Sequence, residues 1–498
     1  MQPEAFPMNA RKIELPPEYE ASLPLVVDLD GTLTLTDTLH ESLIQIIKHS
    51  PISLFQLPLA LVKGKAAFKD AIAEHADLDP EELPWRHDLL DYLRSEKAKG
   101  RPIILATAAH TSIAKKVADH LGLFDKVLAT ESGHNLKGVA KLQSIRAEVG
   151  EEFTYAGDSK ADLPIWKFST SAILVDTDAK TTAEVKLNTF VEREFTNEAV
   201  SPKVWLRALR VHQWLKNLLL FVPLLTAFSF QDPSKFITMC IAFFAFSFAA
   251  SGTYILNDLW DLGSDRRHPR KRKRPFASGT LPIHHGMGIS IGALALAFVL
   301  SAFVTPGFVL MLLLYVVLTT TYSWVLKTYV LIDVLMLSLL YTLRILAGSV
   351  AVAIPASSWL LAFSVFIFLS LALVKRCAEL VSMQDAGREG TRGRDYRVSD
   401  LVVLWPMGVG AALSAVVVFG LFISSPETQA RYASPQILWL VAVGLIYWLA
   451  RLWIKTSRGE MHDDPVVYAI KDKGSRIVVL LMMTMMMLAH SVNLEKLL

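Results

Sequence analysis

The sequence predicts two domains of different class: an α/β domain with a parallel sheet and a helical cap, followed by an all-α bundle of nine membrane-spanning helices. Its 498 residues exceed what a single hydrophobic core usually serves. Short apolar runs alternate with helical stretches up to about residue 175. After about residue 201, long apolar stretches recur to the end of the chain.

Composition places the apolar excess in the second part. Hydrophobic residues make up 52% of the chain and the mean hydropathy is +0.38, although the first 200 residues carry charges at the density of a soluble protein. A net charge of +3 is too small to suggest a nucleic-acid partner. The two cysteines, Cys240 and Cys377, lie in apolar stretches, which argues against a disulfide framework or a cysteine metal site.

The first domain is expected over residues 24–195, after a polar segment at 1–23 that lacks the apolar core of a cleavable signal. Helical, partly apolar sequence over about 36–85 interrupts the strand-helix rhythm and predicts an inserted cap. Five strands are expected, at residues 25–29, 102–106, 126–129, 153–156 and 171–175.

The second domain is expected over residues 203–498. Nine spans are predicted, near residues 215–230, 236–256, 287–304, 308–325, 330–350, 359–374, 401–423, 437–453 and 477–489. So many consecutive apolar stretches disfavour the alternative, buried core helices of a large soluble protein. Cations gather at 266–274 and 375–397, which predicts that these loops, and the first domain with them, face the cytoplasm from a bacterial inner membrane.

Asp28 and Asp30 follow the first predicted strand directly, and Gly31 allows a sharp turn after them. Two carboxylates in this arrangement suit phosphoryl transfer, because Asp28 can attack phosphorus while Asp30 protonates the leaving oxygen. A strand followed by an ordinary Asp-Gly turn is the simpler alternative.

Further polar residues follow later strands. Thr107 and Lys137 can hold phosphate oxygens, and Asp158 and Asp162 can complete a Mg²⁺ site with Asp28. In this order the segments resemble the haloacid dehalogenase-like phosphohydrolases over roughly residues 24–180, a Rossmann-like fold with a cap. The resemblance implies that Asp28 is the nucleophile, Asp30 the general acid and base, and Thr107 and Lys137 the phosphate stabilisers. It makes Asp158 and Asp162 the metal-side acids.

A second acidic motif stands at the end of the second predicted span. Asp258, Asp261 and Asp265 are spaced three and four apart, so on a helix they would share one face and could chelate Mg²⁺. The basic run over 266–274 could hold the rest of a diphosphate. A solvated loop obeying the positive-inside bias would explain the arginines but not the aspartates.

This loop, with its NDxxDxxxD pattern running into HPxKxxRPxASG, resembles the UbiA-type intramembrane prenyltransferases over about residues 203–498. The resemblance implies nine helices around a cavity, Mg²⁺-dependent loss of diphosphate, and substrate contacts from Asn257, Lys271 and Arg274. It also implies a second aspartate pair, but here Asp333 is present and position 337 is leucine.

Four further stretches stand near span ends: 210–217, Asp333 with 344–348, 375–380, and Asp464 with Pro465. Together they resemble motifs of the polyprenyl-phosphate phosphoribosyltransferases within that superfamily. In that branch the donor is phosphoribosyl pyrophosphate and the nucleophile is a polyprenyl phosphate. A donor with both a diphosphate and a 5-phosphate needs extra cations, although snorkelling anchors are the alternative for any single one. The candidate substrate-binding residues near span ends are Lys216, Lys327, Asp333, Arg344, Lys375 and Arg376.

Three functions remain open at this point. The first is phosphoribosyl transfer to a lipid phosphate, with the N-terminal domain removing the 5-phosphate of the product. The second is conventional prenylation of an aromatic or other acceptor from a prenyl diphosphate. The third makes the N-terminal domain a regulatory module, which its complete set of expected catalytic residues disfavours.

Overall fold

The computed structural model describes residues 23–131, 135–197, 199–387, 394–461 and 464–493. The chain divides by its contacts into two compact units, Met1–Ala208 with Asp258–Gly288, and Leu209–Asn257 with Ile289–Leu498. The polar segment expected at residues 1–23 lies, except for Leu23, outside the described residues.

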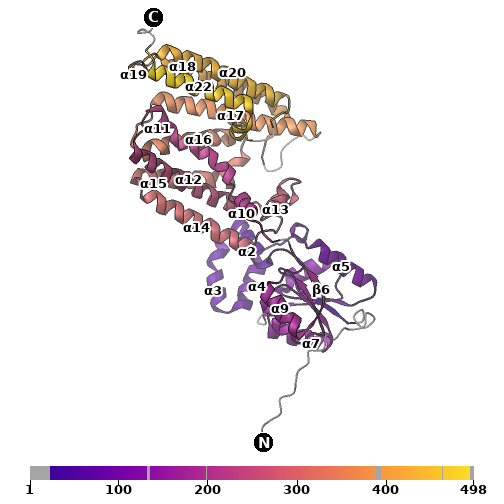
Figure 1. The fold of residues 1–498 in the computed structure, drawn as a ribbon. Helices are drawn as coiled ribbons and strands as arrows, with labels where there is room; N and C mark the ends of the chain where they lie inside the picture. The colour runs from indigo at the N-terminus through magenta and orange to yellow at the C-terminus, as the bar shows by residue number, and fades with distance from the viewer. Residues whose placement is uncertain (1–22, 132–134, 198, 388–393, 462–463, 494–498) are drawn as a thin grey trace. The chain divides into compact units, whose positions relative to one another are not determined.

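The first unit contains a six-stranded parallel sheet with the strand order β3-β2-β1-β4-β5-β6. Figure 1 labels β6 of this sheet and several of the surrounding helices. The strands are β1 (Leu25–Val27), β2 (Ile103–His110), β3 (Lys126–Thr130), β4 (Thr154–Gly157), β5 (Ser171–Val175) and β6 (Phe190–Phe195). All five predicted strands are confirmed, and β6 is an addition that the sequence did not reveal. Because β1 lies between β2 and β4, the residues that follow these strands meet at one edge of the sheet.

Helices cover both faces of the sheet, as parallel strands require. Leu25 and Val27 pack on the side of α5 (His87–Ala98) and α6 (Thr111–Leu121). Val26 packs on the opposite side, against α7 (Val139–Val149) and α8 (Leu163–Trp166), where α9 (Ala179–Asn188) completes the layer. The alternation of side chains along β1 therefore builds two separate cores.

The predicted cap is an insertion of short helices between β1 and α5. It comprises α2 (Thr38–His49), η1 (Pro51–Phe55), α3 (Leu57–Val62), α4 (Lys65–His75) and η2 (Pro80–Glu82). Its small core joins Ile46, Leu57 and Ile72, one residue from each of the three α-helices. Asp37 caps α2 by accepting hydrogen bonds from the backbone N–H groups of Leu39 and His40.

The remainder of the chain is helical. In the described residues, eight helices are long and apolar enough to cross a membrane: α12 (Pro233–Trp260), α14 (Ile283–Ala302), α15 (Pro306–Trp324), α16 (Ile332–Ala351), α17 (Ser358–Asp385), α18 (Leu401–Ile423), α20 (Leu438–Ser457) and α22 (Lys473–Ser491). Shorter helices join them: α10 (Pro202–Ala208), α13 (Leu262–Arg267), α19 (Pro426–Arg431) and α21 (Pro465–Lys471). Helix α17 packs against both α16 and α18.

The first of the nine predicted spans, at residues 215–230, is not a continuous helix of spanning length. The 3₁₀ segment η4 (Val211–Phe221) leads into the short α11 (Val222–Thr226), and Phe228 then adopts a positive φ of 54°. Pro223 stands at the start of α11, where its missing N–H is tolerated. Polar Lys216 and Asn217 are buried in η4, so this segment serves polar contacts inside the bundle.

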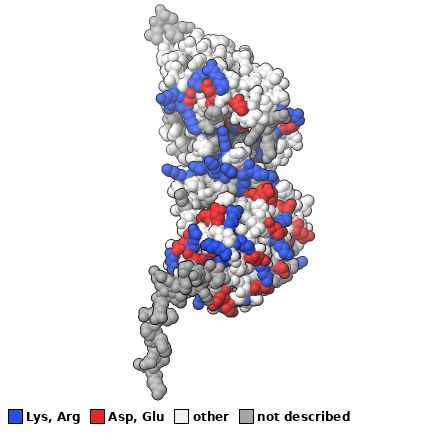
Figure 2. All heavy atoms as spheres, turned by 90° about the vertical axis from the view of Figure 1, so that its right-hand side faces the viewer, with Lys and Arg blue, Asp and Glu red and all other residues white. Residues whose placement is uncertain are grey.

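The surfaces of the two units differ in kind. Figure 2 shows acidic and basic side chains spread over the sheet-containing unit, whereas much of the visible surface of the helical unit is uncharged. Exposed apolar side chains such as Val299, Leu310 and Val417 lie on the spanning helices. Together with the eight apolar helices, this surface is that of an integral, multi-pass membrane protein.

Arg101 ties the edge of the sheet to its surroundings. Its guanidinium is fully buried, and its Nη1 lies 2.7 Å from Glu192 Oε1 on β6 and 3.0 Å from Glu96 Oε2 on α5. Arg101 also donates to the carbonyl oxygen of Leu23 at 2.8 Å and to Thr154 Oγ1 at 2.6 Å. One side chain thus contacts β4, β6, α5 and Leu23, two residues before β1.

We expect Arg101→Ala to destabilise the sheet-containing unit by about 3–5 kcal/mol, because the largely buried carboxylates of Glu96 and Glu192 lose the guanidinium charge that they share. Arg94→Ala is the matched control: its pair with Asp91 is exposed, so the loss is about 1 kcal/mol or less. Pulse proteolysis of the full chain in detergent across a urea series measures the two midpoints. Equal shifts for both variants would contradict the anchoring role.

Candidate functional site

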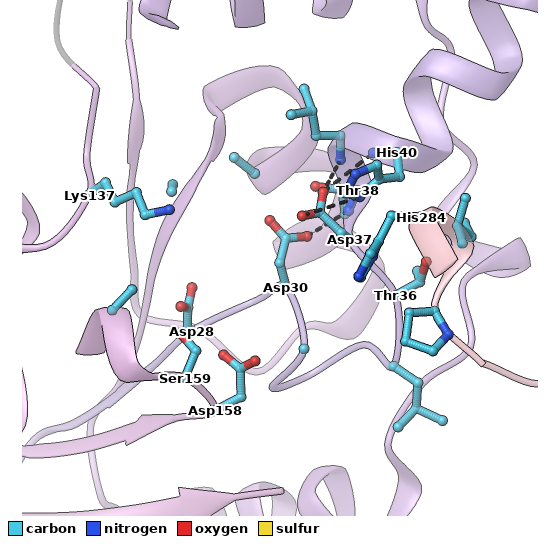
Figure 3. A pocket seen from close by; sticks show the side chains of 18 of the residues that line it. Asp28, Asp30, Thr36, Asp37, Thr38, His40, Lys137, Asp158, Ser159 and His284 are labelled. Carbon is cyan, nitrogen blue, oxygen red and sulfur yellow. Dashed lines mark hydrogen bonds and ion pairs between the residues drawn. The ribbon is translucent and has the colours of Figure 1, made fainter. Parts of the chain in front are cut away.

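Three carboxylates gather at the carboxyl edge of the sheet. Asp28 follows β1, whereas Asp158 and Asp162 follow β4, and each offers an oxygen within 4.8 Å of the others. Figure 3 shows Asp28, Asp30 and Asp158 around one space, with the amine of Lys137 directed toward it. The register of β1 against β4 produces this meeting, since Val27 lies opposite Ala156.

Lys141 on α7 is the counter-charge of this cluster. Its ammonium donates to Asp28 Oδ2 at 2.8 Å and lies 3.9 Å from Asp162 Oδ1. Tyr155 completes the arrangement by donating its hydroxyl to Asp162 at 2.8 Å. The sequence analysis selected Lys137 and missed Lys141, which lies four residues later. A second lysine at this spacing was the feature of the sequence that could have identified it.

Burial is the dominant influence on these acids. Burial, followed by the negative charges of Asp28 and Asp162, raises the pKa of Asp158 to about 8. Burial likewise raises the pKa of Asp28, although the ammonium of Lys141 opposes the shift. Carboxylates that repel one another in this way are the ligands a hard divalent cation prefers, so the donor set fits Mg²⁺.

Asp30 stands apart from the three-carboxylate cluster and faces the cap. Its Oδ1 accepts a hydrogen bond from the backbone N–H of Thr38 at 2.8 Å, at the start of α2. Burial and the nearby charge of Asp37 raise the pKa of Asp30 to about 7. A carboxyl group with this pKa can both donate and accept a proton near neutrality, which suits a general acid and base.

The other two predicted residues of this site differ in position. Lys137 lines a pocket of about 1070 Å³ that contains Asp28 and Asp30. Thr107 is fully buried, and its hydroxyl accepts a hydrogen bond from the N–H of Ala109 at 3.0 Å. The last three residues of β2, Ala108, Ala109 and His110, line the pocket instead. A phosphate contact from Thr107 therefore stays a prediction.

The cap supplies polar groups that the sequence did not single out. Lys69 on α4 donates to the carbonyl oxygen of Ala108 at 2.5 Å and to Asn135 Oδ1 at 2.8 Å, and it lines the same pocket. His284, on the first turn of α14 and within the same unit, lines the pocket as well, and its ring lies 5.4 Å from that of His40 (Figure 3).

The three aspartates of the loop motif do not lie on one continuous helix, as the spacing argument assumed. Helix α12 ends at Trp260, and Asp261 is the N-cap residue of α13. The two outer aspartates meet on Arg274, whose Nη1 lies 3.1 Å from Asp258 Oδ1 and 2.6 Å from Asp265 Oδ2.

Both outer aspartates are withdrawn from solvent. Asp258 and Asp265 are buried, and Asp265 Oδ1 has no hydrogen-bond partner among the described residues. Lys271 Nζ lies 4.0 Å from this oxygen, and Asn257 is half-buried on the last turn of α12. A buried carboxylate oxygen without a hydrogen-bond partner is suited to bind a cation. Among the described residues, carboxylate oxygens of Asp28, Asp158 and Asp162 all lie within 4.8 Å of one another. The three loop aspartates do not form such a group.

In the helical unit, Asp464 joins two of the predicted cations. Lys216 Nζ lies 2.7 Å and Lys375 Nζ 3.4 Å from Asp464 Oδ2. The ring of Tyr341 lies beneath both Lys216, at 5.5 Å, and the guanidinium of Arg344, at 5.6 Å. Arg344 itself donates to Asn217, Tyr315 and the carbonyl of Leu340, which are all neutral groups.

A second charged cluster surrounds Asp333. Arg376 is fully buried and pairs with both Asp333 and Glu379. Tyr322 donates its hydroxyl to Asp333 Oδ1 at 2.8 Å, and Arg394 lies 3.3 Å from Glu379. Lys375 and Arg376 are adjacent in sequence, yet they serve different clusters because successive helical residues point about 100° apart. Lys327 is half-buried in η6 (Leu326–Thr328).

Comparison with known proteins agrees with both sequence resemblances. The model of the UbiA prenyltransferase family matches residues 218–488, more than half of the 498-residue chain. The model of the haloacid dehalogenase-like hydrolases matches residues 25–167.

Relatives carry one or both parts. The uncharacterized protein y4nM of Sinorhizobium fredii is 38% identical over 463 residues, which cover 92% of this chain and 89% of that protein. A decaprenyl-phosphate phosphoribosyltransferase of Mycolicibacterium smegmatis is 31% identical over 290 residues, 55% of this chain and 88% of that protein. The enzyme of the same name from Corynebacterium glutamicum is 33% identical over 230 residues, 45% of this chain and 69% of that protein. The chain therefore belongs to the UbiA prenyltransferase family, as a multi-pass membrane transferase with a fused haloacid dehalogenase-like hydrolase domain.

Proposed function

We propose that the helical domain transfers 5-phosphoribose from phosphoribosyl pyrophosphate to a polyprenyl phosphate, and that the N-terminal domain removes the 5-phosphate from the lipid product. The cluster of Lys216, Lys375 and Arg344 carries this proposal. Two lysines share the single carboxylate of Asp464, and the contacts described for Arg344 are to neutral groups. This excess of positive charge within a membrane domain calls for an anionic ligand, and a donor with three phosphate groups supplies one.

In the transfer step, an oxygen of the lipid phosphate attacks C1 of the ribose. The bond between C1 and the diphosphate oxygen breaks, and inorganic diphosphate leaves with its electron pair. Asp258 and Asp265 would hold Mg²⁺, which would neutralise the departing diphosphate, and Arg274 and Lys271 would bind its oxygens. Each phosphoribosyl transfer leaves a phosphodiester to the lipid and an intact 5-phosphomonoester on the ribose.

In the hydrolytic step, Asp28 attacks phosphorus of the 5-phosphomonoester while Asp30 donates a proton to the leaving ribose oxygen. Asp30 then takes a proton from the water that hydrolyses the aspartyl phosphate. Lys141 orients Asp28, and Lys137 faces the incoming phosphate. Asp158 and Asp162 would hold Mg²⁺ together with Asp28, and its charge would offset the negative charge of the phosphoryl group.

We place both reactions on the cytoplasmic side of a bacterial inner membrane. The positive-inside bias supports this orientation, since basic residues concentrate in the loops at 266–274 and 375–397. Phosphoribosyl pyrophosphate is a soluble, multiply charged compound, so a site open to the cytoplasm gives it direct access.

The direct test offers the purified protein two donor and acceptor pairs. Radiolabelled phosphoribosyl pyrophosphate with polyprenyl phosphate should give labelled lipid in the presence of Mg²⁺. Prenyl diphosphate with an aromatic acid should not react. Labelling only with the second pair would replace phosphoribosyl transfer by conventional prenylation, the reaction named by the family model.

Asp258→Ala should reduce Mg²⁺-dependent transfer by on the order of 10²-fold or more, because stabilisation of a departing diphosphate contributes several kcal/mol. Asp232→Ala, at the other end of α12, is the matched control; its side chain is 43% exposed and should leave transfer near normal. Initial rates of lipid labelling at saturating donor measure the effect. Near-normal transfer by a folded Asp258→Ala protein would remove this residue from the metal site.

Gly31→Ala should abolish most hydrolysis of a soluble phosphomonoester such as p-nitrophenyl phosphate. Gly31 has a φ of +75°, and an added Cβ would lie 2.2 Å from Asp158 Oδ2, so the acid must move. Gly122→Ala shares the backbone strain, with a φ of +62°, but meets no atom within 4 Å. Both variants lose about 1–2 kcal/mol to strain. Equal hydrolysis by the two would exclude a role for the position of Asp158.

Asp28→Asn should separate the two reactions. The amide retains the volume of the carboxylate but cannot attack phosphorus, so transfer should continue and the lipid should accumulate with its 5-phosphate attached. Mass spectrometry of extracted lipid distinguishes the two products by one phosphate group. Identical lipid products from the wild type and the variant would mean that the N-terminal domain acts on another substrate.

A further inference from the structure

The cap exposes an apolar segment to its surroundings. In the stretch from Pro51 to Val62, Ile52 is 80%, Leu59 69% and Val62 87% exposed. Leu57 of the same stretch points into the cap core instead, at 7% exposure. Exposed apolar side chains concentrated in one short segment of a folded domain suit a contact with a protein or a membrane.

Charge distinguishes between these partners. No acidic residue occurs between Pro51 and Lys69, whereas Lys63 and Lys65 follow the apolar stretch directly and are exposed. A short apolar helix followed by lysines is the pattern of a segment that lies in a membrane interface with anionic headgroups. Each lysine near such a surface contributes about 1 kcal/mol of attraction.

The exposed segment is continuous with the pocket of the hydrolase domain. Leu61 and Lys65 line the same pocket as Asp28. His284 lines it too, and this residue belongs to the first turn of α14, a helix long and apolar enough to span a membrane. Apolar and basic residues of the cap therefore take part in lining the pocket, next in sequence to the exposed cap residues.

We infer that the cap segment 51–65 inserts into the interface of an anionic bilayer and admits membrane-borne phosphomonoesters to the pocket. The apolar side chains of Ile52, Leu59 and Val62 enter the acyl boundary, and Lys63 and Lys65 bind lipid phosphates. The substrate of the hydrolase domain is then a lipid whose phosphate end reaches Asp28 while its chain stays in the membrane. The hydrolytic part of this inference rests on the function proposed above.

Membrane depth tests the insertion without reference to activity. In a Cys240→Ser background, single cysteines at Ile52 and Val62 are labelled with an environment-sensitive fluorophore, and the full chain is placed in nanodiscs that contain doxyl-labelled lipid. We expect at least about two-fold quenching, stronger with anionic than with zwitterionic lipid, as for buried interfacial side chains. Leu187→Cys is the control, since Leu187 is an 81% exposed leucine on α9 of the same domain.

Quenching at Val62 no greater than at Leu187 would overturn the inference. It would mean that the segment meets solvent, a second copy or the chain's own helices instead of the bilayer.

Activity then tests whether the segment delivers lipid substrate to the pocket: Leu59→Glu with Val62→Glu should lower hydrolysis of the phosphorylated lipid in nanodiscs by about ten-fold or more. Hydrolysis of p-nitrophenyl phosphate should be unchanged, and an equal loss on both substrates would exclude delivery. Quenching with no hydrolysis of either substrate by the wild type would support insertion and reject the proposed hydrolase.

Discussion

The withdrawal of like charges from water is the constraint on which the hydrolase site depends. Asp28, Asp158 and Asp162 meet at the edge of a parallel sheet because β1 and β4 are neighbours in register. Buried carboxylates at this separation repel one another, and each further charge raises the cost. Lys141 offsets part of that cost, and the remaining negative charge is what makes the site attractive to a divalent cation and its phosphate ligand.

The same constraint appears with the opposite sign in the helical domain. Lys216 and Lys375 are held around Asp464, and Arg344 rests on Tyr341 and neutral acceptors. Buried cations in a membrane domain are costly unless they are paired or bind an anion. Burial also makes substitutions in this cluster destabilising, because removing one charged residue leaves the charge of its partner buried and unpaired.

The proposed reactions give the fusion of the two domains a chemical logic. The proposed transfer leaves a phosphomonoester at the end of a long lipid, a product confined to the membrane. A hydrolase domain in the same chain meets this product in two dimensions, at a far higher local concentration than a free enzyme would. An apolar, basic cap edge is the feature such a domain needs to receive its substrate from a bilayer.

Local patterns were enough to predict the elements and much of the chemistry, since periodicity and strand-end motifs depend on neighbouring residues alone. They placed five strands, the cap and most of the spans, and they selected Asp28, Asp158 and Asp162, which the fold then brought together. The tertiary structure decided what depends on distant partners. Lys141 meets Asp28 across 113 residues of sequence, and Lys216 meets Asp464 across 248.

Local patterns also misled where a long-range contact altered an element. Spacing put Asp258, Asp261 and Asp265 on one helix face, but the helix breaks at Asp261 and the outer pair meets on Arg274. The apolar run at 215–230 predicted a membrane span. The structure has a 3₁₀ segment there instead, in which Lys216 and Asn217 are buried. Strand β6 escaped notice because its Glu192 is satisfied by Arg101, 91 residues away in sequence. A pairing of that kind has no local signature, so only the folded chain could reveal it.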